Sequence, residues 1–331
     1  MLRTLAARSD SFALAVPFRI SRGVRTVADV VTVEIGADGV TGRGEGAPYP
    51  RYGESIEGAL AEIEAVRDAI ERGVTRDELQ ALMPAGAARN AVDCALWDLE
   101  AKLAGRSVAG LLGRAAVAAT PTAMTVSLDT VPAMAAAARA LADVPLIKIK
   151  VDRSDPEAQI RAVRDAAPDP RVIVDPNESW TIGEVERLQP LLAELRIDLL
   201  EQPLPAGEDD ALEGLSPLVP IAADESAHVA GDVTALASKY QVVNIKLDKT
   251  GGLTAALALA DAAAAAGLGV MTGSMISTSL SIAPALVVAA RSAFVDLDGP
   301  LWLAADRPGG VQGVRGVLTP PAPGFWGDTA S

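Results

Sequence analysis

From about residue 120 onward, short β-rich runs alternate with helical stretches at a regular interval. Eight such runs occur, at residues 122–128, 146–151, 171–175, 197–201, 220–224, 242–246, 267–273 and 293–298. Strands that alternate with helices form a parallel sheet covered by those helices. Eight strands within about 180 residues predict a closed barrel with short loops, since such barrels typically take ~250 residues.

The first part of the chain follows a different pattern. Residues 27–35 alternate and are rich in β-branched side chains, a turn follows at 37–39, and a second short strand leads into the glycine-rich residues 42–46. This pattern predicts a β-hairpin rather than a phosphate-binding loop. Residues 55–71 and 90–103 carry apolar side chains at helical spacing and predict two helices.

These patterns predict an α/β fold: a (β/α)7β TIM-like barrel with an N-terminal α+β capping domain. The length of 331 residues allows one large barrel plus a smaller domain. We place the capping domain at residues 1–118, the barrel at 119–304 and a C-terminal tail at 305–331. The tail is rich in proline and glycine, and we expect it to return to the capping domain and complete it.

Composition argues against several classes of partner. The formal net charge is −14, whereas nucleic acids and anionic membrane surfaces are bound by clustered Lys and Arg. The most apolar window, residues 254–271, is mostly alanine and contains Asp261. It predicts a helix with a buried face rather than a membrane span. We therefore expect neither a nucleic-acid partner nor a membrane partner.

The chain contains one histidine, His228, and one cysteine, Cys94. A Cys/His zinc site and an internal disulfide are therefore excluded, which fits a reducing cytosol. P-loop, nucleophile-elbow and dinucleotide-binding motifs are absent from the sequence. The first residues lack the apolar segment of a signal peptide, so we expect a cytoplasmic protein. Cys94 is expected in a helix core, and His228 is expected to be structural.

Charged residues stand at the ends of five successive predicted strands. In chain order they are Lys148 and Lys150, Asp175, Glu201, Asp224, and Lys246. From Lys150 onward the intervals are 25, 26, 23 and 22 residues, so each interval is one strand–helix repeat. All of these charges are therefore expected at one height, at the C-terminal mouth where such barrels place their chemistry. The eighth strand adds Asp296 and Asp298.

The residue types at the mouth indicate a metal site. Asp175, Glu201 and Asp224 form a hard, all-oxygen ligand set without histidine or cysteine. Such a set suits Mg²⁺ and is compatible with Mn²⁺.

Two lysines are expected to face each other across that site, from the second and sixth strands. Opposed bases beside a Lewis acid suit removal and return of a proton next to a carboxylate, with an enediolate stabilised by the metal. A lysine must be neutral to act as a base. A neighbouring cation lowers a lysine pKa, and Lys148 is expected to do so for Lys150.

The sequence resembles the enolase superfamily, in its muconate-lactonizing-enzyme subgroup, and within it the bacterial L-Ala-D/L-Glu epimerases, a dipeptide epimerase family. The resemblance covers nearly the whole chain. It is carried by PFRISRGVRT (17–26), GEGAPYPRYGES (44–55), RNAVDCALWDLEAK (89–102), the K-x-K at 148–150, VDPNESW (174–180), LLEQPLPA (199–206), ADES (223–226), VVNIKLDKTGGLT (242–254) and DLDGPLWLA (296–304). That superfamily is known to use a Lys or His base with Mg²⁺ to stabilise an enediolate.

The resemblance implies a role for each residue of the mouth. Asp175, Glu201 and Asp224 would ligate Mg²⁺, while Lys150 and Lys246 would be the acid/base pair with Lys148 as electrostatic helper. Asp296 and Asp298 match the pair that grips the α-ammonium of a dipeptide. Arg25, expected in a loop of the first domain above the mouth, matches the residue that meets the glutamate side-chain carboxylate.

Further residues are expected around the substrate. Thr125 on the first strand is expected to hydrogen-bond it. Ser274 and Met275 after the seventh strand are expected to touch it, where close relatives often carry a G-C-M stretch, so the change bears on fine specificity. Asn177 and Glu225 are expected to orient the metal ligands.

The resemblance implies epimerisation of Ala-Glu-type dipeptides in reuse of peptidoglycan peptides, in a chain that forms a homo-oligomer. A muconate-type cycloisomerase or an o-succinylbenzoate-synthase-like lyase would use the same scaffold, as would an N-acylamino acid racemase. Those substrates lack a free ammonium, so Asp296 and Asp298 argue against all three. A non-catalytic binding barrel is the remaining alternative, and it has no need of two opposed lysines.

Overall fold

The computed structural model describes residues 2–20 and 23–328 of the chain. Eight parallel strands form the barrel: β5 (Met124–Val126), β6 (Leu146–Lys150), β7 (Arg171–Asp175), β8 (Leu199–Glu201), β9 (Ile221–Ala223), β10 (Val242–Ile245), β11 (Gly269–Gly273) and β12 (Phe294–Asp296). Each strand pairs with the next along the chain. The first and last strands meet where Ala123 N donates to Val295 O at 2.8 Å and Leu297 N donates to Thr122 Oγ1 at 2.8 Å. The predicted eight-stranded barrel is confirmed.

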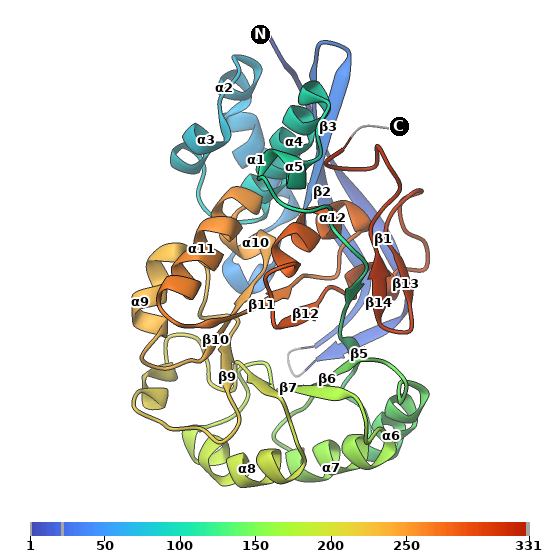
Figure 1. Ribbon diagram of the computed structural model, residues 1–331, viewed down its shortest axis with the longest axis vertical. Helices are drawn as coiled ribbons and strands as arrows, with labels where there is room; N and C mark the ends of the chain where they lie inside the picture. Colours follow the sequence, from blue (N-terminus) through green and yellow to red (C-terminus); the bar gives the residue numbers. More distant parts are fainter. Residues whose placement is uncertain (1, 21–22, 329–331) are drawn as a thin grey trace.

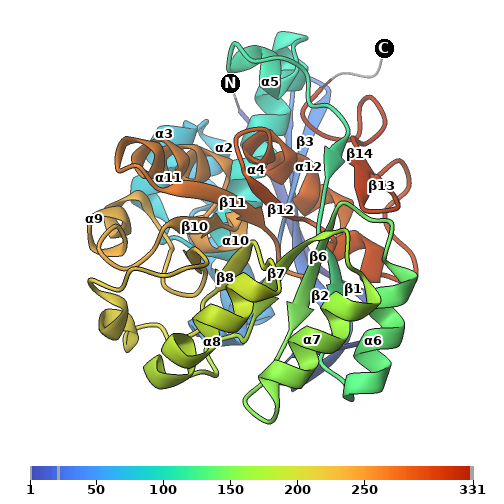
Figure 2. The ribbon, with the colours of Figure 1, turned by 60° about the horizontal axis from the view of Figure 1, so that its bottom comes forward.

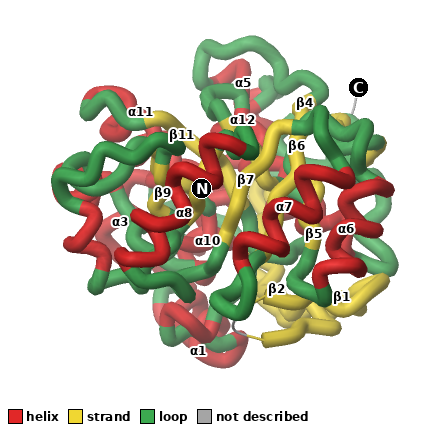
Figure 3. The backbone as a smooth tube through the Cα atoms, turned by 90° about the horizontal axis from the view of Figure 1, so that it is seen from below, coloured by secondary structure: helices red, strands yellow, loops and turns green. Residues whose placement is uncertain are grey.

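Helices cover the outside of the barrel. They are α6 (Val131–Ala140), α7 (Pro156–Ala166), α8 (Ile182–Glu194), α9 (Val233–Leu236), α10 (Leu247–Thr250), α11 (Leu253–Ala265) and α12 (Ser279–Ala289). Figure 1 shows α6, α7 and α8 along the lower rim, and Figure 3 shows the same helices from below. The connection between β8 and β9 carries only a 3-10 turn (Asp209–Leu212). Four prolines between residues 203 and 220 disfavour a longer helix there, because proline lacks the amide hydrogen.

The N-terminal domain is a three-stranded antiparallel sheet packed against helices. Its strands are β1 (Thr4–Ile20), β2 (Gly23–Ala37) and β3 (Val40–Gly46), in that order. The predicted hairpin is confirmed, and its turn places Asp38 and Gly39 at φ 51° and 76°. The long strand β1 was not predicted. Arg25 lies in β2, paired with Phe18, so its expected place in a loop was wrong.

The helices of this domain are α1 (Ile56–Ala65), α2 (Arg67–Glu71), α3 (Arg76–Leu82), α4 (Ala87–Ala104) and α5 (Val108–Leu111). The single helix predicted at 55–71 is interrupted at Val66, which ends α1 and precedes α2. The helix predicted at 90–103 lies within α4, where Cys94 is fully buried. Figure 2 shows α4 between the sheet of this domain and the barrel.

A small sheet and the chain's last described residues link the tail to the rest of the molecule. β4 (Thr120–Pro121), β13 (Gln312–Val314) and β14 (Val317–Thr319) form that sheet. Trp326 Nε1 donates to Cys94 O at 3.1 Å, and Gly327 N donates to Asp98 Oδ1 at 2.6 Å, so the tail contacts α4. The domain boundaries at residues 118 and 304 stay a prediction. Within 2–20 and 23–328, no helix is long and apolar enough to cross a membrane.

The alternating glycines of β3 let α4 lie directly on the sheet. A Cβ at Gly44 would overlap the carbonyl oxygen of Ala91 and come within 2.6 Å of Ala95 N. Gly42 and Gly46 face the same helix in the same way. Both partners of these contacts are backbone, which cannot move aside like a flexible side chain.

We predict that Gly44→Ala lowers the free energy of unfolding by about 3 kcal/mol or more, because overpacking against fixed backbone forces α4 away. Gly183→Ala is the control, since Gly183 lies in α8 with open space around its Cβ position. That change should leave stability equal or raise it by up to about 1 kcal/mol. Urea unfolding of both variants measures this, and equal effects would contradict the packing argument.

Candidate active site

The alternation of side chains along the strands explains how the charged residues reach one cavity. Toward the N-terminal ends of the strands, an apolar plug fills the barrel. Seven of its residues lie in β6 to β12 and Ala123 directly precedes β5: Ala123, Leu146, Ile173, Leu199, Ala222, Val242, Met271 and Phe294. Because side chains alternate in a strand, the residue two positions later also points inward. On β6 this step places Lys148 and then Lys150 beyond Leu146. The same step brings Asp175, Glu201, Asp224, Lys246 and Asp296 to the mouth.

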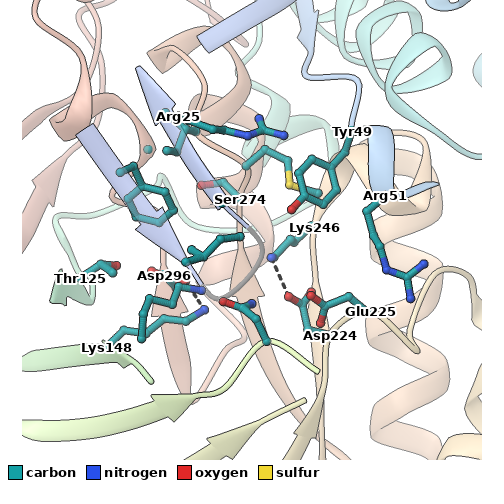
Figure 4. Close-up of a pocket in the computed structure, with 18 of the residues that line it drawn as sticks. Arg25, Tyr49, Arg51, Thr125, Lys148, Asp224, Glu225, Lys246, Ser274 and Asp296 are labelled. Carbon is teal, nitrogen blue, oxygen red and sulfur yellow. Dashed lines mark hydrogen bonds and ion pairs between the residues drawn. The ribbon is translucent and has the colours of Figure 1, made fainter. Parts of the chain in front are cut away.

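A cavity of about 470 Å³ opens at this mouth (Figure 4). Among the residues that line it are Lys148, Lys150, Asp224, Lys246, Asp296 and Asp298. Asp175 and Glu201 lie beneath it and are fully buried. The structure therefore brings together all the charged residues that the strand-end spacing singled out.

Lys148 binds carboxylates from three different strands. Its Nζ lies 2.7 Å from Glu201 Oε2, 3.0 Å from Asp175 Oδ2 and 2.9 Å from Asp296 Oδ2. Burial acts to lower the pKa of Lys148, but these carboxylates outweigh it and hold the pKa well above its ordinary value. These contacts therefore favour the ammonium form of Lys148.

Lys150 and Lys246 stand on opposite sides of the mouth. In the eight-strand order, β6 and β10 are four positions apart, so their ends face each other across the barrel. Lys150 Nζ lies 2.6 Å from Asp175 Oδ2, and Lys246 Nζ lies 2.8 Å from Asp224 Oδ2. Burial acts most strongly to lower the pKa of Lys246, and Lys148 adds to that lowering, but Asp224, Glu201 and Glu225 together raise the pKa more, so it lies above its ordinary value. Lys148 thus opposes the rise at Lys246 without preventing it. Its expected action on Lys150 stays a prediction.

Among the residues that the structure describes, the mouth holds more buried carboxylates than buried lysines. Its six carboxylates are Asp175, Glu201, Asp224, Glu225, Asp296 and Asp298, and its four lysines are Lys148, Lys150, Lys246 and Lys249. With all ten ionised the formal charge is −2. Burial raises the pKa of Glu201 to about 7, and the nearby carboxylates of Asp175 and Asp224 add to that rise while Lys148 opposes it. A divalent cation would balance this excess.

The donor chemistry at the mouth fits a hard divalent ion. In residues 2–20 and 23–328, no three carboxylate, imidazole or thiol groups lie close enough to hold one ion in their present positions. The lysines account for this, because Lys148 Nζ stands between Glu201 and Asp175. Glu201 Oε2 touches that ammonium but accepts no hydrogen bond from any described residue. Each of the three predicted ligands is in contact with an ammonium group: Glu201 with Lys148, Asp175 with Lys150, and Asp224 with Lys246.

Asp296 and Asp298 form a separate carboxylate pair on the far side of Lys148. Asp298 Oδ2 accepts from Thr125 N at 3.1 Å, which places Thr125 at the pocket wall. Asp296 Oδ1 is buried and accepts no hydrogen bond from a described residue. Burial, and next Asp296, raise the pKa of Asp298 to about 6. An unsatisfied oxygen beside a second buried carboxylate fits a cationic group of a ligand.

Other predicted residues line the cavity from the barrel loops and the N-terminal sheet. Arg25 lies above it with its guanidinium 4.7 Å from the centre of the Tyr49 ring. Ser274 and Met275 line it after β11, and Met275 packs with Val30 and Ala47 of the N-terminal domain. Figure 4 shows Arg25 and Tyr49 on the side of the cavity opposite Lys148.

Residues behind the predicted ligands hold them in place. Asn177 donates to Asp175 through its backbone N at 2.8 Å and through Nδ2 at 3.3 Å. Glu225 lines the cavity beside Asp224. Lys249 lies 2.7 Å from Asp224 Oδ1 and also donates to Asn244 O. His228 lies at the edge of this region, where its Nε2 is 3.0 Å from Glu225 O.

The sequence reasoning missed Gln202, which ties two ligand-bearing loops together. Its side-chain oxygen accepts from Asp224 N at 2.8 Å and from Ser226 N at 3.1 Å. Its Nε2 donates to Tyr240 OH at 3.0 Å. Its place directly after Glu201 was a signal that pattern reasoning could have used.

Two protein families match almost all of the chain. Residues 2–113 match the mandelate racemase / muconate lactonizing enzyme N-terminal domain, and residues 133–325 match the enolase C-terminal domain-like family. The chain belongs to the enolase superfamily. The resemblance stated from the sequence is thereby confirmed.

Curated relatives within this superfamily are epimerases and racemases. The chain is 46% identical to L-Ala-D/L-Glu epimerase of Escherichia coli strain K12, over 96% of this chain and 99% of that protein. It is 43% identical to N-acetyl-D-glutamate racemase of a Pseudoalteromonas species, over 86% of this chain and 91% of that protein.

Solved structures of relatives carry metal ions and dipeptides. One is an enolase family member from Agrobacterium tumefaciens with homology to dipeptide epimerases, bound to sodium and L-Ala-L-Glu; it has 51% identity, a TM-score of 0.95, and covers 98% of this chain and 100% of its own. Another is the dipeptide epimerase of Methylococcus capsulatus complexed with Mg and L-Arg-D-Lys; it has 34% identity, a TM-score of 0.89, and covers 97% of each chain.

The Asp296/Asp298 pair gives a stability prediction. The unfolded pKa of an aspartate is about 3.9. A folded-state pKa raised to about 6 means that Asp298 costs stability progressively as the pH rises from about 4 to 6, and fully above that range. In metal-free buffer, Asp298→Asn should raise the free energy of unfolding by on the order of 1–2 kcal/mol at pH 8, and by less at pH 5.

Asp296→Asn is the matched control. Asp296 Oδ2 pairs with Lys148 Nζ, so its loss removes a partner of a buried ammonium and should destabilise the fold. Urea unfolding at pH 5 and pH 8 measures both variants. A loss of stability in Asp298→Asn at pH 8 would contradict a cost from burying the charged Asp298 carboxylate beside Asp296.

Proposed function

We propose that this chain is a Mg²⁺-dependent dipeptide epimerase that interconverts L-Ala-L-Glu and L-Ala-D-Glu. The observation that carries the proposal is the pair of lysines on opposite sides of the mouth, Lys150 from β6 and Lys246 after β10. A reaction that inverts one carbon needs a proton removed from one face and delivered to the other. Two bases that face each other across a cavity supply this, and a binding protein has no use for them.

Asp175, Glu201 and Asp224 are the proposed Mg²⁺ ligands. The formal charge of −2 at the mouth and the all-oxygen donors support this assignment. When bound, a divalent ion there supplies Lewis acidity toward the substrate carboxylate and so makes the adjacent C–H more acidic. Asn177 and Glu225 are proposed to keep the ligands oriented.

The lysines move the proton at the α-carbon of the C-terminal residue. In one direction Lys150 or Lys246, in its neutral form, takes the proton, and the other lysine, as an ammonium, delivers one to the opposite face. In the structure Lys150 is paired with Asp175, and Lys246 with Asp224. Each lysine can reach the substrate when its carboxylate binds another partner. Lys148 remains charged and stabilises the negative charge that develops on the substrate.

The two ends of the dipeptide are held by different groups. The α-ammonium is proposed to bind between Asp296 and Asp298, because the first has an unsatisfied oxygen and the second a raised pKa. Arg25 is proposed to bind the glutamate side-chain carboxylate. It lines the cavity, and no described acidic residue is paired with it. Thr125, Ser274 and Met275 are proposed to form the wall between them.

N-acyl glutamate racemisation is the second candidate, since a relative 43% identical carries that name. The lysines and Arg25 would serve that reaction equally well. An acylated nitrogen carries no charge, however, and would leave Asp296 and Asp298 without a cationic partner. The dipeptide is therefore preferred.

We also propose a cytoplasmic location, a role in reuse of peptidoglycan peptides and a homo-oligomeric state. The single buried cysteine fits a cytoplasmic location, and the proposed substrate fits reuse of peptidoglycan peptides. Size-exclusion chromatography with light scattering would determine the oligomeric state.

The first test follows the α-protons by NMR in D₂O with Mg²⁺. With L-Ala-L-Glu, we expect the glutamate α-proton signal to disappear as the L,D diastereomer forms. N-acetylglutamate, run in parallel, should react much more slowly. If only N-acetylglutamate reacts, N-acyl glutamate racemisation replaces dipeptide epimerisation as the proposed function. If neither compound nor any of a panel of other L,L-dipeptides reacts, a lyase or cycloisomerase function is favoured instead.

The second test separates the two faces. Lys150→Ala and Lys246→Ala should each lower epimerisation by about 10²- to 10⁴-fold, the usual range for loss of a general acid or base. One variant should still exchange the α-proton of L-Ala-L-Glu, and the other that of L-Ala-D-Glu. Arg153→Ala is the control, since this exposed cation pairs only with Glu184 among described residues. Loss of exchange from the same diastereomer in both variants would contradict a two-face mechanism.

The third test concerns the metal. Chelation should stop α-proton exchange, and added Mg²⁺ should restore it. Glu201→Gln should raise the half-saturating Mg²⁺ concentration, because it removes a charged ligand oxygen. Asp261→Asn changes an exposed carboxylate of α11 that pairs with Arg291 and does not line the cavity, so it should leave that concentration unchanged. Exchange that persists in chelator would exclude metal dependence.

A further inference from the structure

A cluster of aromatic side chains lies between the substrate cavity and the barrel loops. The chain has only three tyrosines and one histidine. Two of these tyrosines and the histidine meet here: the rings of Tyr49 and Tyr52 lie 5.5 Å apart, and those of Tyr52 and His228 lie 4.9 Å apart, both edge to face. The cluster therefore runs from the N-terminal domain to the loop after β9.

Arg25 stands at the cavity end of this cluster. Its guanidinium lies 4.7 Å from the centre of the Tyr49 ring, and Tyr49 also packs against the group formed by Val30, Ala47 and Met275. An aromatic face attracts a guanidinium and restricts where it can lie. Because no described carboxylate is paired with Arg25, the Tyr49 ring is its observed anchor.

The backbone that carries Tyr49 is fixed within its own domain. Glu54 accepts from Tyr49 N at 2.8 Å and from Ala87 N, at the start of α4, at 2.8 Å. A short 3-10 turn (Pro50–Tyr52) follows, in which Tyr52 N donates to Tyr49 O at 2.9 Å. The position of Tyr49 relative to α4 is therefore set by the Glu54 carboxylate, which accepts a hydrogen bond from the backbone of each.

The same turn is fastened to the barrel at two points. Arg51 forms a bidentate pair with Glu178, with Nε to Oε2 at 3.0 Å and Nη2 to Oε1 at 2.8 Å. Glu178 lies three residues after Asp175 and also accepts from Ala206 N at 2.8 Å. The second point is the contact of Tyr52 with His228. Both barrel partners belong to loops next to proposed metal ligands, Asp175 and Asp224.

We infer that Tyr49 is a positioning residue that fixes Arg25 at a set distance from the metal-bearing loops and thereby determines the preference for an acidic second residue. Arg51 and Tyr52 fix Tyr49 against the barrel, Tyr49 fixes Arg25, and Arg25 meets the side-chain carboxylate. Arg25 and Arg51 both line the cavity. Because the Arg51 guanidinium is paired with Glu178, the Arg25 guanidinium is the one proposed to bind the substrate. The inference rests on the proposed epimerase function and adds a determinant of its substrate class.

The test compares two dipeptides of the same shape, L-Ala-L-Glu and L-Ala-L-Gln, which differ in the charge of the side chain. The specificity ratio is the kcat/KM of the first divided by that of the second, measured by α-proton exchange with Mg²⁺. Tyr49→Leu should lower this ratio roughly 3- to 30-fold, the range expected for loss of a cation–aromatic contact. The loss should appear in KM for L-Ala-L-Glu, with kcat nearly unchanged. Tyr49→Phe keeps the ring and should keep the specificity ratio of the wild-type protein.

The outcomes separate the inference from the function. If the wild-type protein exchanges neither dipeptide, the proposed function fails. If the wild-type protein is active and Tyr49→Leu slows both dipeptides equally, Tyr49 is only structural and the inference is overturned. An unchanged ratio in Tyr49→Leu also overturns it. Should Tyr49→Leu fail to fold, Tyr49→Met serves instead, since it also lacks the ring and keeps an extended apolar side chain.

Discussion

The structure depends on an excess of buried negative charge at the mouth of the barrel. In the part of the chain that the structure describes, six carboxylates and four lysines lie there almost without solvent, and with all ten ionised their formal charge is −2. Burial of unpaired charge is costly, so most members of such a group need a partner of opposite charge. Lys148 provides much of that pairing, since it contacts carboxylates from β7, β8 and β12. The raised pKa values of Glu201 and Asp298 show where the pairing is incomplete. Those two positions are the ones assigned to a divalent ion and to a substrate ammonium.

The two domains divide the work. The barrel strands place the charged groups, because an apolar plug at one end leaves the inward positions at the other end to polar residues. The N-terminal domain closes the mouth and supplies Arg25 and Tyr49. Helix α4 joins the two halves: Asn90 Nδ2 donates to Asp248 Oδ1 at 2.8 Å, and Arg89 Nη2 donates to Thr250 O at 2.6 Å. Both barrel partners lie in α10, which begins directly after Lys246, so the domain that carries Arg25 also steadies one of the proposed bases.

Much of this arrangement could be predicted from the sequence because it follows from short-range rules. The strand–helix repeat predicted the barrel, and the 22- to 26-residue spacing of the strand-end charges predicted which residues lie at its mouth. Contacts between distant segments could not be predicted this way. The strand β1 and the place of Arg25 within β2 depend on pairing along a long ribbon. The central position of Lys148 depends on three other strands, and the Arg51–Glu178 pair joins residues 127 positions apart. No local pattern encodes such distances.

The most direct test of this account is a crystal structure of the protein with Mg²⁺ and L-Ala-L-Glu. The account predicts one ion in contact with Asp175, Glu201 and Asp224, and the Nζ atoms of Lys150 and Lys246 on opposite faces of the glutamyl α-carbon. The ammonium of the dipeptide should lie between Asp296 and Asp298, and its side-chain carboxylate should lie at Arg25. An ion bound elsewhere, or both lysines on one face of the α-carbon, would contradict the account.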